Sequence, residues 1–193
     1  MNDELISEFI KECAKTFNEI KKKNKFEINK ALDSCLINLR SLKGKIPEEK
    51  DKSHGSIILE ITDSFLEATK LLINLKYSKF FYNILIIFKK FLEYNLFAKE
   101  KANEIIILLK MFNDYPKIGE ECHKKTIEII QTYIFSEYFE YKYSSLAIIY
   151  ILILKEFNIT NNSRNKDFKN PIRLLFTTLT DKIYKSNNID IIM

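Results

Sequence analysis

Glycine and proline are scarce in this chain, and that scarcity limits its fold more than any other property of the sequence. Only 3 Gly and 3 Pro occur in 193 residues. Sandwiches and barrels need frequent turns, and these two residues are the ones that most often form them. Long segments without turn residues favour helices, and a hydrophobic content of 46% supplies enough apolar side chains for a buried core. The sequence therefore predicts an all-α fold.

Apolar residues recur with a helical period along most of the chain. Leu5, Ile6, Phe9, Ile10 and Cys13, for example, fall on one side of a helix and define one buried face. The same pattern predicts about eight helices joined by short polar breaks, at about 3–24, 28–39, 56–75, 77–95, 99–113, 116–135, 143–157 and 171–185.

The helix lengths, roughly 15 to 20 residues, and the short connections are typical of stacked helical hairpins such as armadillo and HEAT repeats. Segments such as SSLAIIYILIL, residues 144–154, are apolar on more than one face, which also favours a stack. No repeat of about 40 residues aligns along the chain, so an irregular helical bundle is the alternative. We expect a single domain over 1–193, with an exposed loop near 43–56 and a polar turn near 158–170.

No catalytic motif is present. A glycine-rich phosphate loop, G-x-S-x-G, H-E-x-x-H and C-x-x-C are all missing from the sequence. Cys122 and His123 are adjacent, but neighbours on a helix point about 100° apart, so we expect a buried cysteine beside an exposed histidine. His54 stands alone in the charged loop. The sequence predicts no enzyme, no cofactor and no metal site; the alternative is an active site assembled from residues distant in sequence.

Three cysteines without close spacing, Cys13, Cys35 and Cys122, indicate neither a disulfide framework nor a zinc site. Met1 is followed by Asn-Asp-Glu rather than by a basic stretch and an apolar run, unlike a signal peptide. We expect a cytoplasmic protein.

The net charge is +5, but it arises from 31 Lys and Arg against 26 Asp and Glu. Such a mixed surface is unlike the concentrated basic patch of a nucleic-acid binder, so we expect no nucleic-acid partner. A basic helical nucleic-acid-binding domain is the alternative function, motivated by the net charge, the tyrosines and the run from Lys21 to Lys25.

Aromatic residues crowd the break before the seventh predicted helix. Tyr138, Phe139, Tyr141 and Tyr143 lie so close together that we do not expect all four to be buried. An exposed aromatic cluster at a helix corner is a candidate protein interface. Internal packing of the same four side chains is the alternative.

Residues 9–32 (FIKECAKTFNEIKKKNKFEINKAL), 63–97, NITNNS at 158–163 and LLFTTLTDKI at 174–183 follow one another in a distinctive order. This order resembles the N-terminal dimerisation and cyclophilin-binding (DCB) domain of the large Arf guanine-nucleotide exchange factor and Mon (monensin-sensitivity) Golgi scaffold family. In that family a Thr-Asn-Asn-Thr turn precedes the closing helix, and Thr160, Asn161, Asn162 and Ser163 stand in its place here. The chain departs from the family at 164–166, where Arg-Asn-Lys replaces small alanines.

The resemblance implies a non-catalytic, armadillo-like scaffold module for vesicle trafficking. It implies a module that forms a homodimer or docks on a neighbouring helical domain, and that in some members binds an active Arf-like GTPase. It also implies a peripheral location at the Golgi or trans-Golgi membrane, reached through partners.

Overall fold

The computed structural model describes residues 3–22, 26–42, 52–116, 118–139, 143–162 and 169–190. These ranges contain eight α-helices and no strand, so the all-α prediction is confirmed. Two short 3-10 turns, η1 (Ser78–Phe80) and η2 (Lys99–Lys101), lead into the fourth and fifth helices. The helices are α1 (Asp3–Lys21), α2 (Phe26–Ser41), α3 (Lys52–Asn74), α4 (Phe81–Glu93), α5 (Ala102–Asp114), α6 (Glu120–Phe135), α7 (Tyr143–Asn162) and α8 (Lys169–Asp190).

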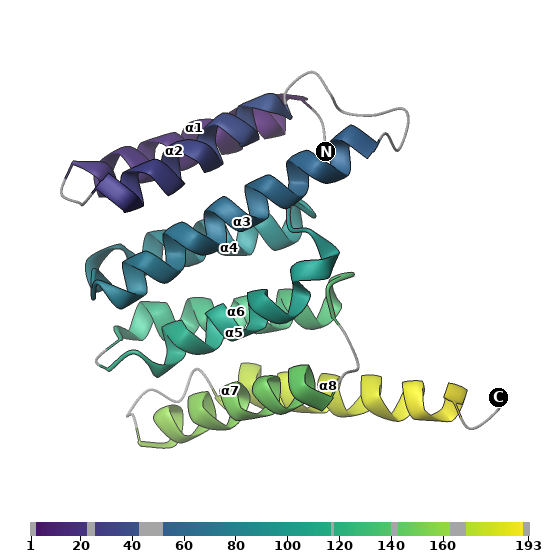
Figure 1. The fold of residues 1–193 in the computed structure, drawn as a ribbon. Coiled ribbons are helices and arrows are strands. Elements are labelled where there is room, and N and C mark those ends of the chain that lie inside the picture. Colours follow the sequence, from purple (N-terminus) through teal and green to yellow (C-terminus); the bar gives the residue numbers. More distant parts are fainter. Residues whose placement is uncertain are drawn as a thin grey trace.

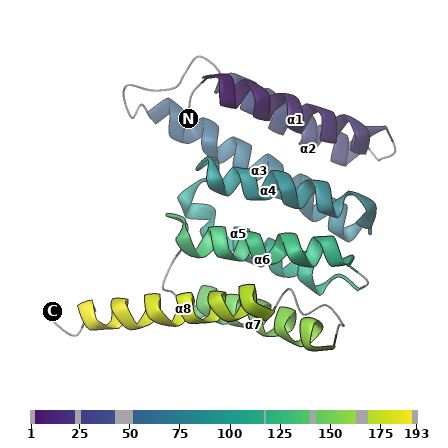
Figure 2. The ribbon, with the colours of Figure 1, turned by 180° about the vertical axis from the view of Figure 1, so that it is seen from behind.

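Consecutive helices pair and stack on one another in two layers (Figures 1 and 2). One layer holds α2, α3, α5 and α7 in that order, because α2 packs on α3, α3 on α5, and α5 on α7. The other layer holds α1, α4, α6 and α8 in the same way. The arrangement is the helical stack that the segment lengths predicted, with each pair contacting mainly the next.

α3 begins at Lys52, which lies inside the exposed loop predicted near 43–56. That part of the loop prediction is wrong; residues 43–51 lie outside the described ranges. Gly55 is inside the helix, with open space where a Cβ would lie. One such glycine costs a helix only about 1 kcal/mol relative to alanine, and the apolar face that starts at Ile57 packs on the core and offsets this cost.

Two helices end in tight turns that contain no glycine. After α3 and α4 the backbone φ is positive at Lys76 (60°) and Asn95 (53°). Directly after Lys76, the N–H of Tyr77 donates a hydrogen bond to the carbonyl of Leu72 at 3.1 Å. An equivalent backbone hydrogen bond is present at the C-terminal end of α4. This is the Schellman ending, in which glycine is the usual residue. The chain therefore turns sharply despite its shortage of glycine.

Aromatic rings fill the region where the first two pairs of helices meet. Phe65 of α3 stacks on Phe91 of α4 with ring centroids 4.4 Å apart. Phe97, after α4, lies 5.1 Å from Phe91 and 5.3 Å from Phe88. Phe9 of α1 meets Phe91 edge-on at 5.6 Å. Such ring pairs contribute about 0.5–1.5 kcal/mol each beyond the burial of apolar area, so this cluster fastens α1 to the rest of the stack.

The pair formed by α7 and α8 lies at one end of the stack. Its packing partners are α5 and α6, and no described helix covers its opposite side (Figures 1 and 2). The C-terminal part of α8 extends beyond the neighbouring helices. Within the described ranges, no helix combines the length and the apolar composition needed to span a bilayer.

Candidate functional site

Tyr138, the first of the predicted interface residues, is buried and not available to a partner. Its side chain is 1% exposed. The ring meets Phe97 edge-on at 6.1 Å, and its hydroxyl accepts a hydrogen bond from the Phe97 N–H at 3.2 Å. Burial raises the pKa of this phenol well above its usual range. Tyr138 therefore joins the core to the turn after α4, and its assignment to an interface is wrong.

Phe139, the second of these residues, is half-buried and packs against the core. Its ring lies edge-on to Tyr133 at 6.3 Å, and the Lys182 ammonium sits 5.2 Å from its centroid. Lys182 also donates to the carbonyl of Ile134, which attaches α8 to the end of α6. Tyr141 lies outside the described residues, as does the side chain of Tyr143, the first residue of α7.

The stretch Thr160 to Ser163, predicted to form a turn, lies largely in a helix. α7 continues through Asn162, so Thr160, Asn161 and Asn162 belong to its last turns and not to a break; Ser163 lies outside the described residues. Threonine, isoleucine and asparagine disfavour a helix by only a fraction of 1 kcal/mol each. No glycine or proline stops the helix in this stretch, and the first five residues of the turn predicted near 158–170 are therefore helical.

His123 belongs to a buried polar cluster and is not the exposed histidine that the sequence predicted. Its Nδ1 lies 3.0 Å from Oε1 of Glu156, which is 1% exposed. Asn113 donates to the same carboxylate oxygen at 2.8 Å. The histidine side chain itself is only 14% exposed. Buried polar groups need such partners, so the cluster fastens α5, α6 and α7 together.

Cys122 is buried, as predicted, and burial raises the pKa of its thiol. Burial likewise raises the pKa of the Cys35 thiol to about 12. The nucleophile in cysteine chemistry is the thiolate. These two thiols are therefore protonated at neutral pH, which is the state of structural cysteines.

Lysines in the described part of the chain are mostly paired with carboxylates. Lys101 lies 2.9 Å from both Asp63 and Glu104, and Lys70 lies 3.1 Å from Glu104, so four side chains link α3 to the start of α5. Lys21, the first residue of the predicted basic run, pairs with Asp33. Paired charges make a mixed surface, whereas a nucleic-acid interface concentrates free positive charge.

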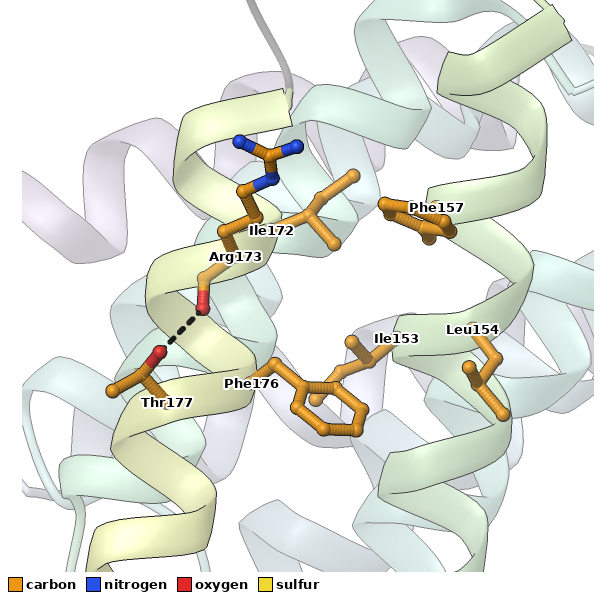
Figure 3. A pocket seen from close by; sticks show the side chains of 7 residues that line it. All are labelled: Ile153, Leu154, Phe157, Ile172, Arg173, Phe176 and Thr177. Atoms are coloured by element: carbon orange, nitrogen blue, oxygen red, sulfur yellow. Dashed lines mark hydrogen bonds between the residues drawn. The ribbon is translucent and has the colours of Figure 1, made fainter.

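A groove of about 440 Å³ lies between α7 and α8 (Figure 3). Phe157 of α7 faces Ile172 of α8 across it, and Phe176 closes one side. Leu154 and Phe176 remain 51% and 41% exposed. We call this the α7–α8 groove; it is lined by Ile153, Leu154, Phe157, Ile172, Arg173, Phe176 and Thr177.

Two polar residues line the groove beside these apolar side chains. The Thr177 hydroxyl donates to the Arg173 carbonyl at 3.1 Å, so its polar group is satisfied within the helix. The Arg173 guanidinium lies on the α8 side near Ile172 (Figure 3) and is exposed. The groove therefore offers an apolar floor with a single positive charge at its margin.

A second feature, the outward face of α7, continues the groove through Leu154. We call it the α7 seam and define it as Ser144, Ala147, Ile151, Leu154 and Asn158, all exposed. The spacing alternates between three and four residues, which is the spacing of a coiled-coil contact. The two charged residues of α7 in this stretch point elsewhere: Lys155 pairs with Asp114 at 3.0 Å, and Glu156 is buried with His123.

Exposed apolar side chains gather on this hairpin. Among the described residues, five of the eleven large apolar side chains that are exposed lie on α7 and α8, which are two helices of eight. They are Ile151, Leu154, Leu174, Phe176 and Tyr184. Leu154 and Phe176 among them meet in the α7–α8 groove, and exposed apolar surface of this kind marks interaction sites.

The sequence carried a signal for this surface that was interpreted only as evidence for a stack. Residues 144–154 are apolar on more than one face, and a helix of that kind is normally covered on most sides. In the structure α5, α6 and α8 pack on α7, while Ile151 and Leu154 remain exposed. The apolar pattern of α7 alone does not show which of its faces is covered by other helices. The structure shows which helices pack on α7 and therefore which face stays exposed.

In the described part of the chain, no group of three or more His, Cys, Asp or Glu side chains is placed to hold a metal ion. No known family model, no curated protein and no solved structure matches this chain.

Proposed function

We propose that this chain is a non-catalytic protein–protein interaction module that binds through the outward face of its last hairpin. The observation that carries the proposal is the exposed apolar surface formed by Ile151 and Leu154 of the α7 seam and by the α7–α8 groove. The terminal unit of a helical stack usually turns a polar face to water, since it has no neighbour there. α7 and α8 instead present the kind of face that inner units bury.

The groove suits a helix of a partner. In helix-in-groove recognition, apolar side chains spaced three and four residues apart fill an apolar channel, and charged groups at its edge set the orientation. Leu154, Phe157 and Phe176 provide the apolar contacts. Arg173 favours a partner with an acidic residue beside its apolar stripe.

The buried polar groups of the stack support a scaffold more than an enzyme. Asn113 and His123 both contact the same carboxylate oxygen of Glu156, so these three side chains link three helices. Burial raises the pKa of the Cys122 and Cys35 thiols, which keeps both thiols protonated at neutral pH. The groove itself is lined mainly by hydrocarbon, with no acid or base placed to move a proton.

The cellular process that we propose for this module is vesicle trafficking. The resemblance of residues 9–32, 63–97 and 158–183 to DCB domains supports a scaffold for Golgi or endosomal vesicle trafficking, peripheral at the membrane through its partners. An Arf-like GTPase in its active form is then the partner to test first. The all-helical stack is compatible with this class.

Binding of the purified chain to Arf and Arf-like GTPases, loaded with a non-hydrolysable GTP analogue or with GDP, tests the proposal. We expect binding that requires the GTP form and that is lost in Phe176→Asp, because a carboxylate in the groove opposes apolar contact. Ile107→Asp is the matched control, since Ile107 is 39% exposed on α5, away from the groove. Equal binding of both variants would argue against the groove, and absence of binding to either nucleotide form would remove the GTPase assignment.

The alternative function, a nucleic-acid-binding domain, predicts a different result. Binding of the chain to nucleic acid would fall steeply as the salt concentration rises, because such binding depends on the release of counterions. We expect equal, weak retention on heparin and on a neutral resin, since the lysines of the described ranges are largely paired. Strong retention on heparin alone would favour the alternative.

A further inference from the structure

The α7–α8 groove has a buried apolar floor and preformed walls. Ile153 and Ile172, each 1% exposed, form the floor. Phe157 of α7 and Phe176 of α8 form the walls (Figure 3). The Phe176 ring meets the Tyr150 ring edge-on with centroids 5.4 Å apart, and this contact holds Phe176 in place. A volume of about 440 Å³ and an apolar lining are typical of sites for small ligands.

Positive charge lies at one end of the groove. Among the described residues that line it, Arg173 is the only charged one, and it is exposed. Its guanidinium lies near Ile172, whereas Leu154 and Phe176 lie toward the other end (Figure 3). The Arg173 end also holds the first turns of α8, and the N-terminus of a helix carries a partial positive charge. One end of the groove therefore attracts an anion, and the rest attracts hydrocarbon.

The other polar side chain of the lining has its partner within α8. The Thr177 hydroxyl donates to the Arg173 carbonyl at 3.1 Å. A ligand with several polar groups would bury some of them in the groove without partners, and such burial costs free energy. The groove therefore matches a ligand with one negative end and an unbroken apolar body.

The groove is also short. It spans about 6 Å of α7, from Ile153 to Phe157, and about 7.5 Å of α8, from Ile172 to Thr177. A helix is about 10 Å wide with its side chains, so it covers the rim and sends single side chains between the walls. An alkyl chain lies between the walls along its whole length.

We propose that the α7–α8 groove binds a free medium-chain fatty acid, with its carboxylate at Arg173 and its alkyl chain on Ile153 and Ile172. This inference rests on the proposed interaction function, because the fatty acid occupies the surface that a partner helix covers. Bound fatty acid therefore competes with the partner and regulates the module.

NMR titration of the isotope-labelled full chain with hexanoate, octanoate and decanoate, each below its micelle concentration, tests the ligand class. We expect the largest shifts in the parts of α7 and α8 that line the groove. The dissociation constant should fall by up to about fourfold for each methylene that the groove buries. It should stop falling once the alkyl chain is longer than the groove.

Arg173→Gln tests the contact with the carboxylate. We expect it to weaken octanoate binding by about threefold to fivefold, since an exposed charge pair contributes modestly. Binding of octanol, which carries no charge, should change by less than about twofold. Arg40→Gln is the matched control, because Arg40 is exposed on α2. Both arginines are exposed, so circular dichroism should be the same for the two variants and the original chain.

Three results would overturn the assignment of the ligand. They are equal affinities for all three chain lengths, equal effects of Arg173→Gln and Arg40→Gln on octanoate, and binding that occurs only above the micelle concentration. If octanoate and a GTPase both bind, saturating octanoate should weaken GTPase binding, and independent binding of the two would overturn the competition.

Failure of the proposed function is seen separately. GTPase binding that is lost in Phe176→Asp, together with no octanoate binding, would exclude the fatty acid and keep the interaction function. Octanoate binding with the expected variant pattern, together with no GTPase binding, would keep the ligand site and exclude that partner.

Discussion

Lys76 and Asn95 occupy left-handed backbone positions that glycine usually fills. The left-handed conformation costs an ordinary residue roughly 1–2 kcal/mol, whereas asparagine tolerates it better. We predict that Lys76→Gly stabilises the fold by about 0.5–1 kcal/mol, after allowance for the greater entropy of glycine in the unfolded chain. Asn95→Gly should change stability less. Urea denaturation of both variants checks the prediction, and an equal gain for the two would contradict it.

Tyr138 contributes one hydrogen bond to the interior, and its removal should be measurable. Tyr138→Phe keeps the ring against Phe97 but leaves the Phe97 N–H without its partner. We expect a loss of about 1–2 kcal/mol in the free energy of unfolding. Tyr184→Phe is the control, since Tyr184 is 70% exposed. If Tyr138→Phe instead weakened self-association at unchanged stability, the original interface assignment would return.

The error at Tyr138 has a clear physical origin. Helical periodicity predicts which residues of a regular segment are buried, but Tyr138 lies in a break where that period does not apply. Its burial depends on Phe97, which is 41 residues away along the chain. Contacts of this kind follow from how the hairpins stack, and a local pattern does not contain them.

At the scale of elements, the network of Lys101, Glu104, Lys70 and Asp63 predicts a dependence of stability on pH. Hydrogen bonds from Lys101 and Lys70 lower the pKa of the Glu104 carboxyl. The unfolded chain therefore binds a proton more readily than the folded chain, and stability rises with pH in that range. The contribution is complete above about pH 5 and is lost as the pH falls through the usual range for glutamate, near 4, and below.

Glu104→Gln should therefore flatten the decline in stability between about pH 5 and pH 3. The Glu104 side chain is 41% exposed, so solvent screening limits the difference to about 0.5–1 kcal/mol. Urea denaturation at a series of pH values measures it. Glu8→Gln is the control, because Glu8 is exposed and lies on α1 away from the network. An identical slope for Glu104→Gln and the original chain would show that the network contributes nothing.

Most of the elements themselves could be predicted from the sequence. All eight helices occur within a few residues of the predicted ranges, because their apolar periods are long and Gly and Pro rarely interrupt them. The ends were less predictable: α3 starts early at Lys52, and α7 runs on through Asn162. At both ends the residues are weakly disfavoured in helices, and the neighbouring turns of helix decide the boundary.

At the scale of the whole molecule, a stack held by contacts between neighbouring hairpins should open from its ends. Amide hydrogen exchange can therefore locate the surface that a partner covers. When a partner is bound, α7 and α8 should exchange more slowly while α1 and α2 change little, because binding stabilises only the hairpin that it covers. In Phe176→Asp this slowing should disappear. A uniform slowing across the chain would contradict a local interface.

The uncovered side of α7 and α8 lies at one end of the described stack (Figure 1). Solenoids need a capping unit with a polar outer face for solubility. A partner helix seated in the α7–α8 groove would act as that cap, because it would cover the apolar side chains and turn its own polar face to water. Binding would then extend the core by one layer, so recognition and completion of the fold would be the same event.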